Sequence, residues 1–173
     1  MDIIERAHIH TEQCSFNNNI LHDIILKQSD NEDIGAMMTK WDCFDVPEFK
    51  NIGDYAMNVV KGWDNGDDVE NFGELELECL WGQWYREGDY QEPHEHYPNH
   101  YSFVYYVNTP DGSAPLVFPT SDYKHYPKSG QLIIFPAWVI HLVPPNKCTG
   151  RSIVAGNMYY KRTINNVSTL PYI

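Results

Sequence analysis

The sequence is poor in basic residues, in paired cysteines and in long apolar runs, and each shortage excludes a class of protein. Its 12 Lys and Arg face 24 Asp and Glu, and the net charge of −12 repels nucleic-acid phosphates. The four cysteines are dispersed without a CxxC pair, so we expect free thiols rather than a zinc knuckle or a disulfide framework. No apolar run suits a membrane span or a secretory signal. We therefore expect a cytoplasmic protein with no nucleic-acid or membrane partner.

The 173 residues predict a single domain whose two parts differ in pattern. Residues 1–73 are expected to be mostly helical, because apolar residues fall at helical spacing in NNNILHDIILKQ and in the segment that opens with Pro47. Residues 74–173 are expected to be β, beginning with the alternating ELELECLW and continuing with YSFVYYV, APLVF, QLIIF, VIHLV and RSIVAGNMYY. The order predicts an α+β domain whose sheet folds into a sandwich or a small barrel.

The stretch EPHEHYPNHYSFVYY contains the first candidate for a metal site. On a strand, His94 and His96 would project from one face and reach one cation together, while Glu95 would point the other way. A third ligand must come from elsewhere, and His141 in GQLIIFPAWVIH is the downstream candidate. Two neighbouring ligands and one distant ligand can occupy one face of an octahedron and leave open positions. The alternative is a solvated loop that contains histidines by chance.

Arg151 begins the predicted strand that follows His141. An arginine inside a barrel needs an anion, and its planar fork suits a carboxylate, so a bound acid is the expected partner. Ile153, Ala155 and Asn157 share the parity of Arg151 on this strand, so Asn157 can also face inward, with the small Ala155 leaving room between them. The alternative is a surface arginine at the start of a strand.

The segments HEHYPNHYSFVYY, SGQLIIFPAWVIH and RSIVAGN resemble the Fe(II)/2-oxoglutarate-dependent oxygenases, in particular a small group frequent in phages and marine bacteria. The resemblance covers about Trp84 to Tyr160. It implies a double-stranded β-helix, a jelly-roll and cupin-like barrel with flanking N-terminal helices. It also implies a hydroxylase that consumes 2-oxoglutarate and dioxygen at an iron ion.

Carried over residue by residue, the resemblance implies that His94, His96 and His141 are the catalytic metal ligands and that Arg151 holds the remote carboxylate of 2-oxoglutarate. It further suggests Ser102, Tyr106 and Asn157 for the cosubstrate pocket. Most of the wider superfamily has Asp or Glu where this sequence has His96. A third imidazole leaves the dipositive charge of the metal to be balanced by the cosubstrate. Glu95 at a bulge, a water or another residue are the alternatives for that ligand.

Other classes remain open at this point. A cupin-type dioxygenase or isomerase that does not use 2-oxoglutarate fits the HxH pattern, but Arg151 has no task in it. Three neutral histidines also suit a zinc hydrolase, although no base is evident. A non-catalytic barrel that binds a metal or a small acid is the third alternative.

The substrate is not identified by the sequence. The resemblance to prolyl hydroxylases suggests a peptidyl proline, while free amino acids and other small molecules remain open. The pocket walls are expected to include Tyr85, Tyr90, Tyr97 and Trp138. A homodimer is compatible with the resemblance, because barrels of this kind often pair through flanking strands.

Overall fold

The computed structural model describes residues 7–33, 35–63 and 73–161. The helices are α1 (Asn18–Gln28) and α2 (Pro47–Trp63), with a short 3-10 turn, η1 (Cys43–Asp45), before α2. The strands are β1 (His10–Gln13), β2 (Asn31–Asp33), β3 (Ala36–Met38), β4 (Glu74–Tyr85), β5 (Gln91–His94), β6 (Tyr101–Asn108), β7 (Leu116–Phe118), β8 (Tyr123–His125), β9 (Gln131–Pro136), β10 (His141–Val143) and β11 (Arg151–Lys161). The ends of the predicted domain, 1–6 and 162–173, lie outside the described residues, so the extent of the single domain stays a prediction.

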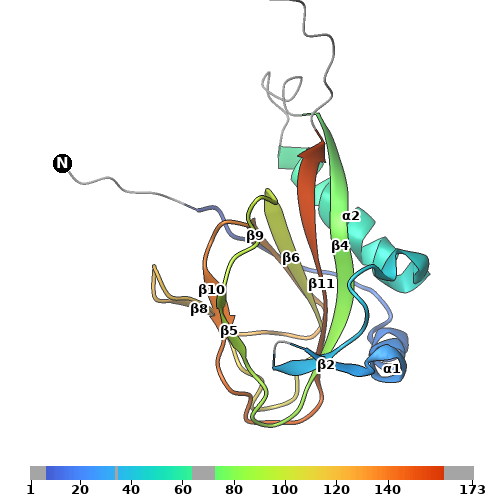
Figure 1. Cartoon of the computed structure of the whole chain (residues 1–173), viewed down its shortest axis with the longest axis vertical. Coiled ribbons are helices and arrows are strands. Elements are labelled where there is room, and N and C mark those ends of the chain that lie inside the picture. Colours follow the sequence, from blue (N-terminus) through green and yellow to red (C-terminus); the bar gives the residue numbers. More distant parts are fainter. Residues whose placement is uncertain (1–6, 34, 64–72, 162–173) are drawn as a thin grey trace, which may run out of the picture.

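The strands form two antiparallel sheets that face one another (Figure 1). The major sheet has the order β1-β9-β6-β11-β4-β3-β2, and the minor sheet has the order β5-β10-β7-β8. No strand pairing within the described ranges joins the edges of the two sheets, so the predicted barrel is an open double-stranded β-helix rather than a closed one. The N-terminal part is also less helical than expected, because it supplies β1, β2 and β3 to the major sheet.

The two predicted helices are present and cover the outer face of the major sheet (Figure 1). Asn17 caps α1, because its side-chain oxygen accepts a hydrogen bond from the Ile20 amide at 3.3 Å. Pro47 starts α2, where its missing N–H leaves no bond unmade. Both helices bury one apolar face, which consists of Leu21 and Ile25 in α1 and of Phe49, Ile52, Ala56 and Val60 in α2.

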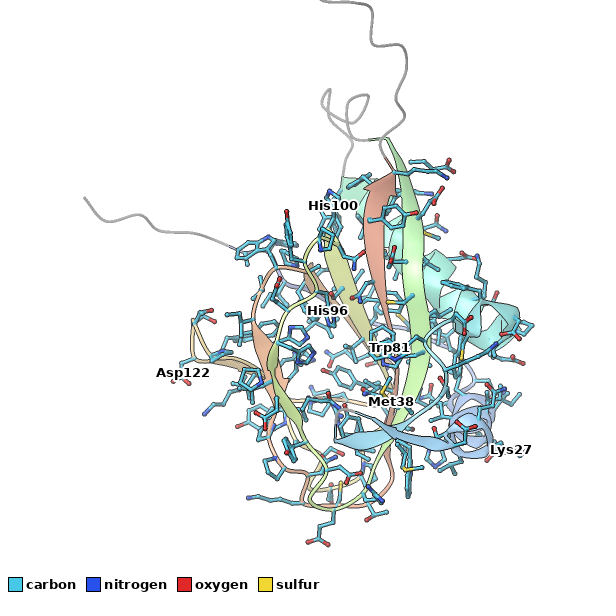
Figure 2. The ribbon with its side chains drawn as sticks, viewed as in Figure 1. Lys27, Met38, Trp81, His96, His100 and Asp122 are labelled. Atoms are coloured by element: carbon cyan, nitrogen blue, oxygen red, sulfur yellow. The ribbon has the colours of Figure 1, made fainter. Side chains whose placement is uncertain are left out.

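The central strands β6, β9 and β11 of the major sheet are buried on both faces, which explains their long apolar runs. In β6, Phe103, Tyr105 and Val107 pack in the cluster under the helices, whereas Val104 and Tyr106 belong to the cluster between the sheets. Gly82 allows the helices to approach β4, since a Cβ there would lie 2.8 Å from Ile25 and 3.0 Å from Phe49. Figure 2 shows Trp81 and His96 in the space between the sheets, where the candidate site lies.

Two expectations from composition can be compared with the described residues. Cys14, Cys43, Cys79 and Cys148 are all free thiols, as predicted. Neither α1 nor α2 is long and apolar enough to cross a membrane.

Candidate metal and carboxylate site

Three imidazoles meet between the two sheets. His94 ends β5, His141 begins β10, and the two residues are paired opposite each other in the minor sheet. Their ring centres lie 4.3 Å apart, and the centre of the His96 ring lies 5.0 Å from that of His94 and 5.2 Å from that of His141. One ligand atom from each ring lies within 4.8 Å of the others, a spacing that suits a shared metal ion. The sequence therefore identified three residues that do converge.

His96 reaches this group by a different route from the one expected. β5 ends at His94, so His96 lies in the following turn and not on the strand. The backbone holds it instead, because the His96 amide donates a hydrogen bond of 2.7 Å to the carbonyl of Ala137, just beyond β9. Glu95 makes a different contact, because its carboxylate accepts a hydrogen bond from the Tyr97 amide at 2.9 Å.

The backbone also fixes the tautomers of two imidazoles. Nδ1 of His94 lies 2.7 Å from the carbonyl oxygen of Glu92, and Nδ1 of His141 lies 2.9 Å from that of Val139. Because a carbonyl oxygen can only accept, Nδ1 must carry the proton in each ring, which leaves the lone pair on Nε2. Such carbonyl bonds are the usual way in which a protein orients metal-binding histidines.

Burial keeps the imidazoles of His96 and His141 neutral. Burial, reinforced by the neighbouring His94, lowers the pKa of His96 from 6.5 to about 4. The same two causes lower the pKa of His141 to about 3, against a raising effect of the Val139 carbonyl. Both rings therefore offer a lone pair at neutral pH, as metal binding requires.

This arrangement makes the stability of the metal-free protein depend on pH. A histidine whose folded-state pKa is lowered binds its proton more readily in the unfolded chain, so stability falls as the pH drops below the unfolded value near 6.5. For His141 and His96 the loss continues down to their folded pKa values of about 3 and about 4, with a slope of up to about 1.4 kcal/mol per pH unit for each residue. Urea denaturation of metal-free protein between about pH 7 and about pH 5 measures this pH dependence of the free energy of unfolding. The variant His141→Leu should show a weaker dependence, and an unchanged dependence would contradict the assignment.

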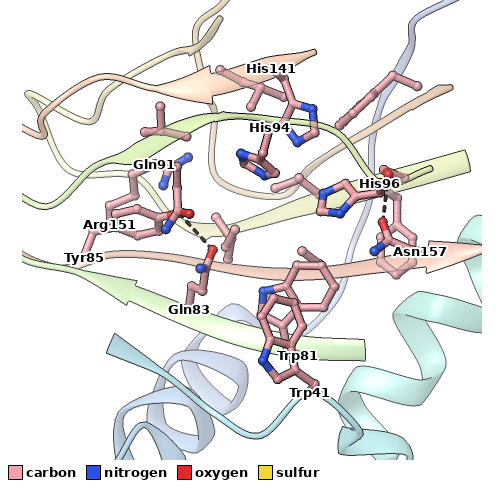
Figure 3. Close-up of a pocket in the computed structure, with 18 residues that line it drawn as sticks. Trp41, Trp81, Gln83, Tyr85, Gln91, His94, His96, His141, Arg151 and Asn157 are labelled. Carbon is pink, nitrogen blue, oxygen red and sulfur yellow. Dashed lines mark hydrogen bonds between the residues drawn. The ribbon is translucent and has the colours of Figure 1, made fainter. Parts of the chain in front are cut away.

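A buried cation lies in the same pocket as the imidazoles (Figure 3). Arg151 is only 1% exposed, and its guanidinium carbon lies 4.3 Å from the centre of the Tyr85 ring and 5.8 Å from that of Tyr106. Its Nε and Nη1 have no hydrogen-bond partner, and no carboxylate among the described residues forms an ion pair with it. A buried charge left in this state costs several kcal/mol, so the pocket is complementary to an anion.

Other polar groups near Arg151 were missed by sequence reasoning. Gln91 is 5% exposed, its amide Nε2 has no hydrogen-bond partner, and it lines the pocket from β5. The Tyr85 hydroxyl donates to Gln83 Oε1 at 2.9 Å, and burial raises the pKa of Tyr85, so it stays protonated. A glutamine at the start of a three-to-four-residue strand has no sequence signal that could have marked it. Trp41 and Trp81, whose tilted rings lie 4.6 Å apart, centre to centre, also line the pocket and were missed as well.

Ser102 and Asn157 lie at the other end of the pocket from Arg151. Asn157 is on the same face of β11 as Arg151, and strand geometry puts the two Cα atoms about 20 Å apart. The Ser102 hydroxyl donates to Asn157 Oδ1 at 2.7 Å, and Asn157 Nδ2 donates to Cys79 Sγ at 3.2 Å. Figure 3 shows the imidazoles between Arg151 and Asn157. The assignment of Ser102 and Asn157 to the cosubstrate pocket stays a prediction.

The remaining predicted side chains lie in several places. Tyr106 is fully buried and packs near Arg151 without lining the pocket, while Tyr85 lines it. Tyr90 borders a second hollow that opens onto the imidazoles. Tyr97 is 76% exposed and Trp138 lines a different surface hollow, so neither is a wall of this pocket.

The fold is shared with solved oxygenase structures. A viral collagen prolyl hydroxylase from Paramecium bursaria Chlorella virus-1, solved as a 2-oxoglutarate complex, superposes with a TM-score of 0.72 at 14% identity, covering 88% of this chain and 96% of that one. A prolyl hydroxylase from Trichoplax adhaerens, in complex with a hypoxia-inducible-factor peptide fragment, superposes with a TM-score of 0.63 at 14% identity. The match covers 88% of this chain and 83% of that one. A Pseudomonas putida prolyl-4-hydroxylase superposes with a TM-score of 0.57 at 14% identity, covering 90% of this chain and 92% of that one. No protein-family model matches the sequence, and the search of curated proteins found no match.

These comparisons confirm the predicted fold. At 14% identity they show a common architecture, so the chain is a double-stranded β-helix protein with the fold of the 2-oxoglutarate–Fe(II) prolyl hydroxylases. In this chain that fold carries a three-histidine group and a buried arginine in one pocket.

Proposed function

We propose that this protein is an Fe(II)- and 2-oxoglutarate-dependent dioxygenase that hydroxylates a small-molecule or peptide-borne substrate. The observation that carries the proposal is the buried guanidinium of Arg151, whose Nε and Nη1 have no hydrogen-bond partner and which lies in one pocket with three imidazoles. A cupin-type enzyme without 2-oxoglutarate, or a zinc hydrolase, would give this cation nothing to bind.

The residues fit the two implied groups. The Nε2 atoms of His94 and His141, with the ring of His96, form one face of donors for iron and leave other positions open. The positive charges of iron and the two negative charges of 2-oxoglutarate cancel when all three ligands are neutral. Along β11, Arg151 and the small Ala155 are about 13 Å apart, which leaves room for a five-carbon dicarboxylate between the guanidinium and the imidazoles.

When bound, iron supplies the redox chemistry by which 2-oxoglutarate and dioxygen give succinate and carbon dioxide, with the second oxygen atom going to a substrate C–H bond as a hydroxyl group. The protein has simpler tasks. Arg151 and Gln91 hold one carboxylate of the cosubstrate and so fix its orientation. The side chains between the sheets keep bulk water from the reacting atoms. Ser102 and Asn157, which bond to each other, border the opposite side of the metal position.

The proposal is tested by adding Fe(II) and then 2-oxoglutarate to the purified protein without oxygen, followed by air. We expect a visible charge-transfer band that needs both components, and then succinate. Oxidation of an organic compound without 2-oxoglutarate would favour the cupin alternative, zinc-dependent hydrolysis would favour a hydrolase, and metal binding without any turnover would favour a binding barrel.

Gln91→Glu should move stability and cosubstrate affinity in opposite directions. The new carboxylate would lie in the pocket of Arg151, close to the Tyr85 hydroxyl, and would pair with the buried guanidinium. We expect the metal-free variant to unfold at a higher temperature, while 2-oxoglutarate affinity falls about 100-fold because its anion site is filled. Thermal unfolding and the anaerobic titration measure the two effects. Gln91→Met is the matched control, since it removes the amide without adding a charge, and equal behaviour of the two variants would contradict the proposal.

Two finer points stay proposals. The peptide in the Trichoplax structure supports a substrate carried on a peptide, although a free small molecule fits the same opening. The homodimer remains a prediction to be measured by the molar mass in solution.

A further inference from the structure

A second hollow, the entrance groove, connects the imidazoles with solvent. It is lined by Gly35, Trp41, Tyr90, Gln91, Glu92, His94 and His96. Four of these, Trp41, Gln91, His94 and His96, also line the inner pocket, so the groove leads to the candidate metal position. Since the far end of the inner pocket is closed by the buried Arg151, a substrate would enter through the groove.

The groove presents two aromatic rings that are exposed and yet fixed. Trp41 is 39% exposed and Tyr90 is 42% exposed. The Trp41 ring lies 4.6 Å from the ring of Trp81, centre to centre, and the Trp41 carbonyl accepts a hydrogen bond of 2.9 Å from the Leu80 amide. Figure 3 shows the two indoles together below the imidazoles. Rings held in place beside a reaction site form a preorganised binding surface.

Tyr90 also borders the groove, and its backbone is held by hydrogen bonds. Its amide donates to the Gly35 carbonyl at 3.1 Å, and the preceding Asp89 accepts hydrogen bonds from Arg86 and, through its carbonyl, from the Asn146 amide. Gly35 permits this approach, because its φ is +81° and a Cβ there would lie 2.5 Å from the Tyr90 carbonyl oxygen. The Trp41 ring and the backbone of Tyr90 thus have fixed positions before any ligand arrives.

The charge of the groove selects among ligands. Glu92 contributes an exposed carboxylate, and no Lys or Arg is among the described residues that line the groove. The whole chain carries a net charge of −12. Aromatic faces and a nearby carboxylate are the combination that binds ammonium groups.

We propose that the entrance groove recognises its substrate by a substituted ammonium group, held against Trp41 and Tyr90 with Glu92 as the counter-charge. An aliphatic carbon next to that group would then lie toward the imidazoles. The reaction at that carbon rests on the proposed function, whereas the recognition itself needs neither iron nor 2-oxoglutarate.

The test uses metal-free protein and two probes of the same shape, choline and its uncharged carbon isostere 3,3-dimethylbutan-1-ol. The indole N–H signals of the protein are followed by NMR, and the Trp41 signal is assigned with Trp41→Phe. We expect choline to shift this signal and to bind at least about 10-fold more tightly than the isostere. Equal affinities would show a merely apolar groove and would overturn the proposal, as would the absence of any shift with choline.

Variants separate the groove from the rest of the surface. Tyr90→Leu and Glu92→Gln should each weaken choline binding several-fold, while Tyr97→Leu, which removes an exposed tyrosine outside the groove, should leave it unchanged. Unchanged binding in both groove variants would overturn the proposal. The charge-transfer titration with iron and 2-oxoglutarate, run on the same wild-type sample, reports on the proposed function independently.

Discussion

Replacing Arg151 with methionine will weaken 2-oxoglutarate binding by about 100-fold or more and leave Fe(II) binding nearly unchanged. The guanidinium is 1% exposed and has two N–H donors without partners, so a carboxylate placed there makes charge-assisted bonds away from water. Methionine fills a similar volume and offers no donor. Anaerobic titration with 2-oxoglutarate at saturating Fe(II) measures the affinity, and a separate titration measures the metal.

The same substitution has a second expected effect of opposite sign. Without cosubstrate, Arg151 is a buried charge with no carboxylate partner among the described residues and with the rings of Tyr85 and Tyr106 beside it, so its removal should leave the free energy of unfolding unchanged or raise it. Arg86→Met is the matched control, because Arg86 pairs with Asp89 at the surface and does not line the pocket. If Arg151→Met bound 2-oxoglutarate as the wild type does, the carboxylate site would have to lie elsewhere.

The major sheet was predictable from the sequence because its long strands either begin with alternating apolar and acidic residues, as β4 does, or are apolar runs, as β6 and β11 are. The parity argument placed Arg151, Ile153, Ala155 and Asn157 on one face of β11, and all four line the pocket. The alternation of ELELECLW holds at the start of β4 but not at its end. There, one face of the strand is covered by α1 and α2 and the other face by the minor sheet. Apolar runs that are buried on both sides still predict strands, so the fold class followed.

Among the short strands, β7 and β10 were predicted from APLVF and VIHLV, whereas the others were not, and the site depends on them. β5, β8 and the three N-terminal strands have three or four residues each, too few for a periodic pattern. The position of His96 depends on one backbone hydrogen bond to Ala137, and that of Trp41 on stacking with Trp81. Such contacts join segments that are distant in the sequence, so they arise only when the chain has folded. We identified His94, His96 and His141 from their residue types and from a family resemblance. Local periodicity alone could not identify these residues as a metal site.

His141→Ala will abolish stoichiometric Fe(II) binding, and succinate formation with it. His141 and His94 are the two rings whose tautomers are fixed by backbone carbonyls, and they face each other across the β5–β10 pair. Without His141, the remaining two imidazoles lie on one side of the metal position, so the ion loses its only ligand from β10. We expect a loss of affinity of about 100-fold or more, measured by equilibrium dialysis with Fe(II) or with Mn(II) as an air-stable substitute.

His96→Asp distinguishes a metal effect from a folding effect in this experiment. Aspartate at position 96 restores a carboxylate ligand of the kind that Fe(II) accepts alongside two histidines, so this variant should retain the metal while His141→Ala does not. The added negative charge would make the loaded centre one unit more negative, and 2-oxoglutarate, a dianion, should then bind less tightly than in the wild type. If His141→Ala kept a full equivalent of iron, the three-histidine site would be wrong. If His96→Asp bound 2-oxoglutarate more tightly, the balance of charge between three neutral imidazoles and the cosubstrate would not be what this pocket exploits.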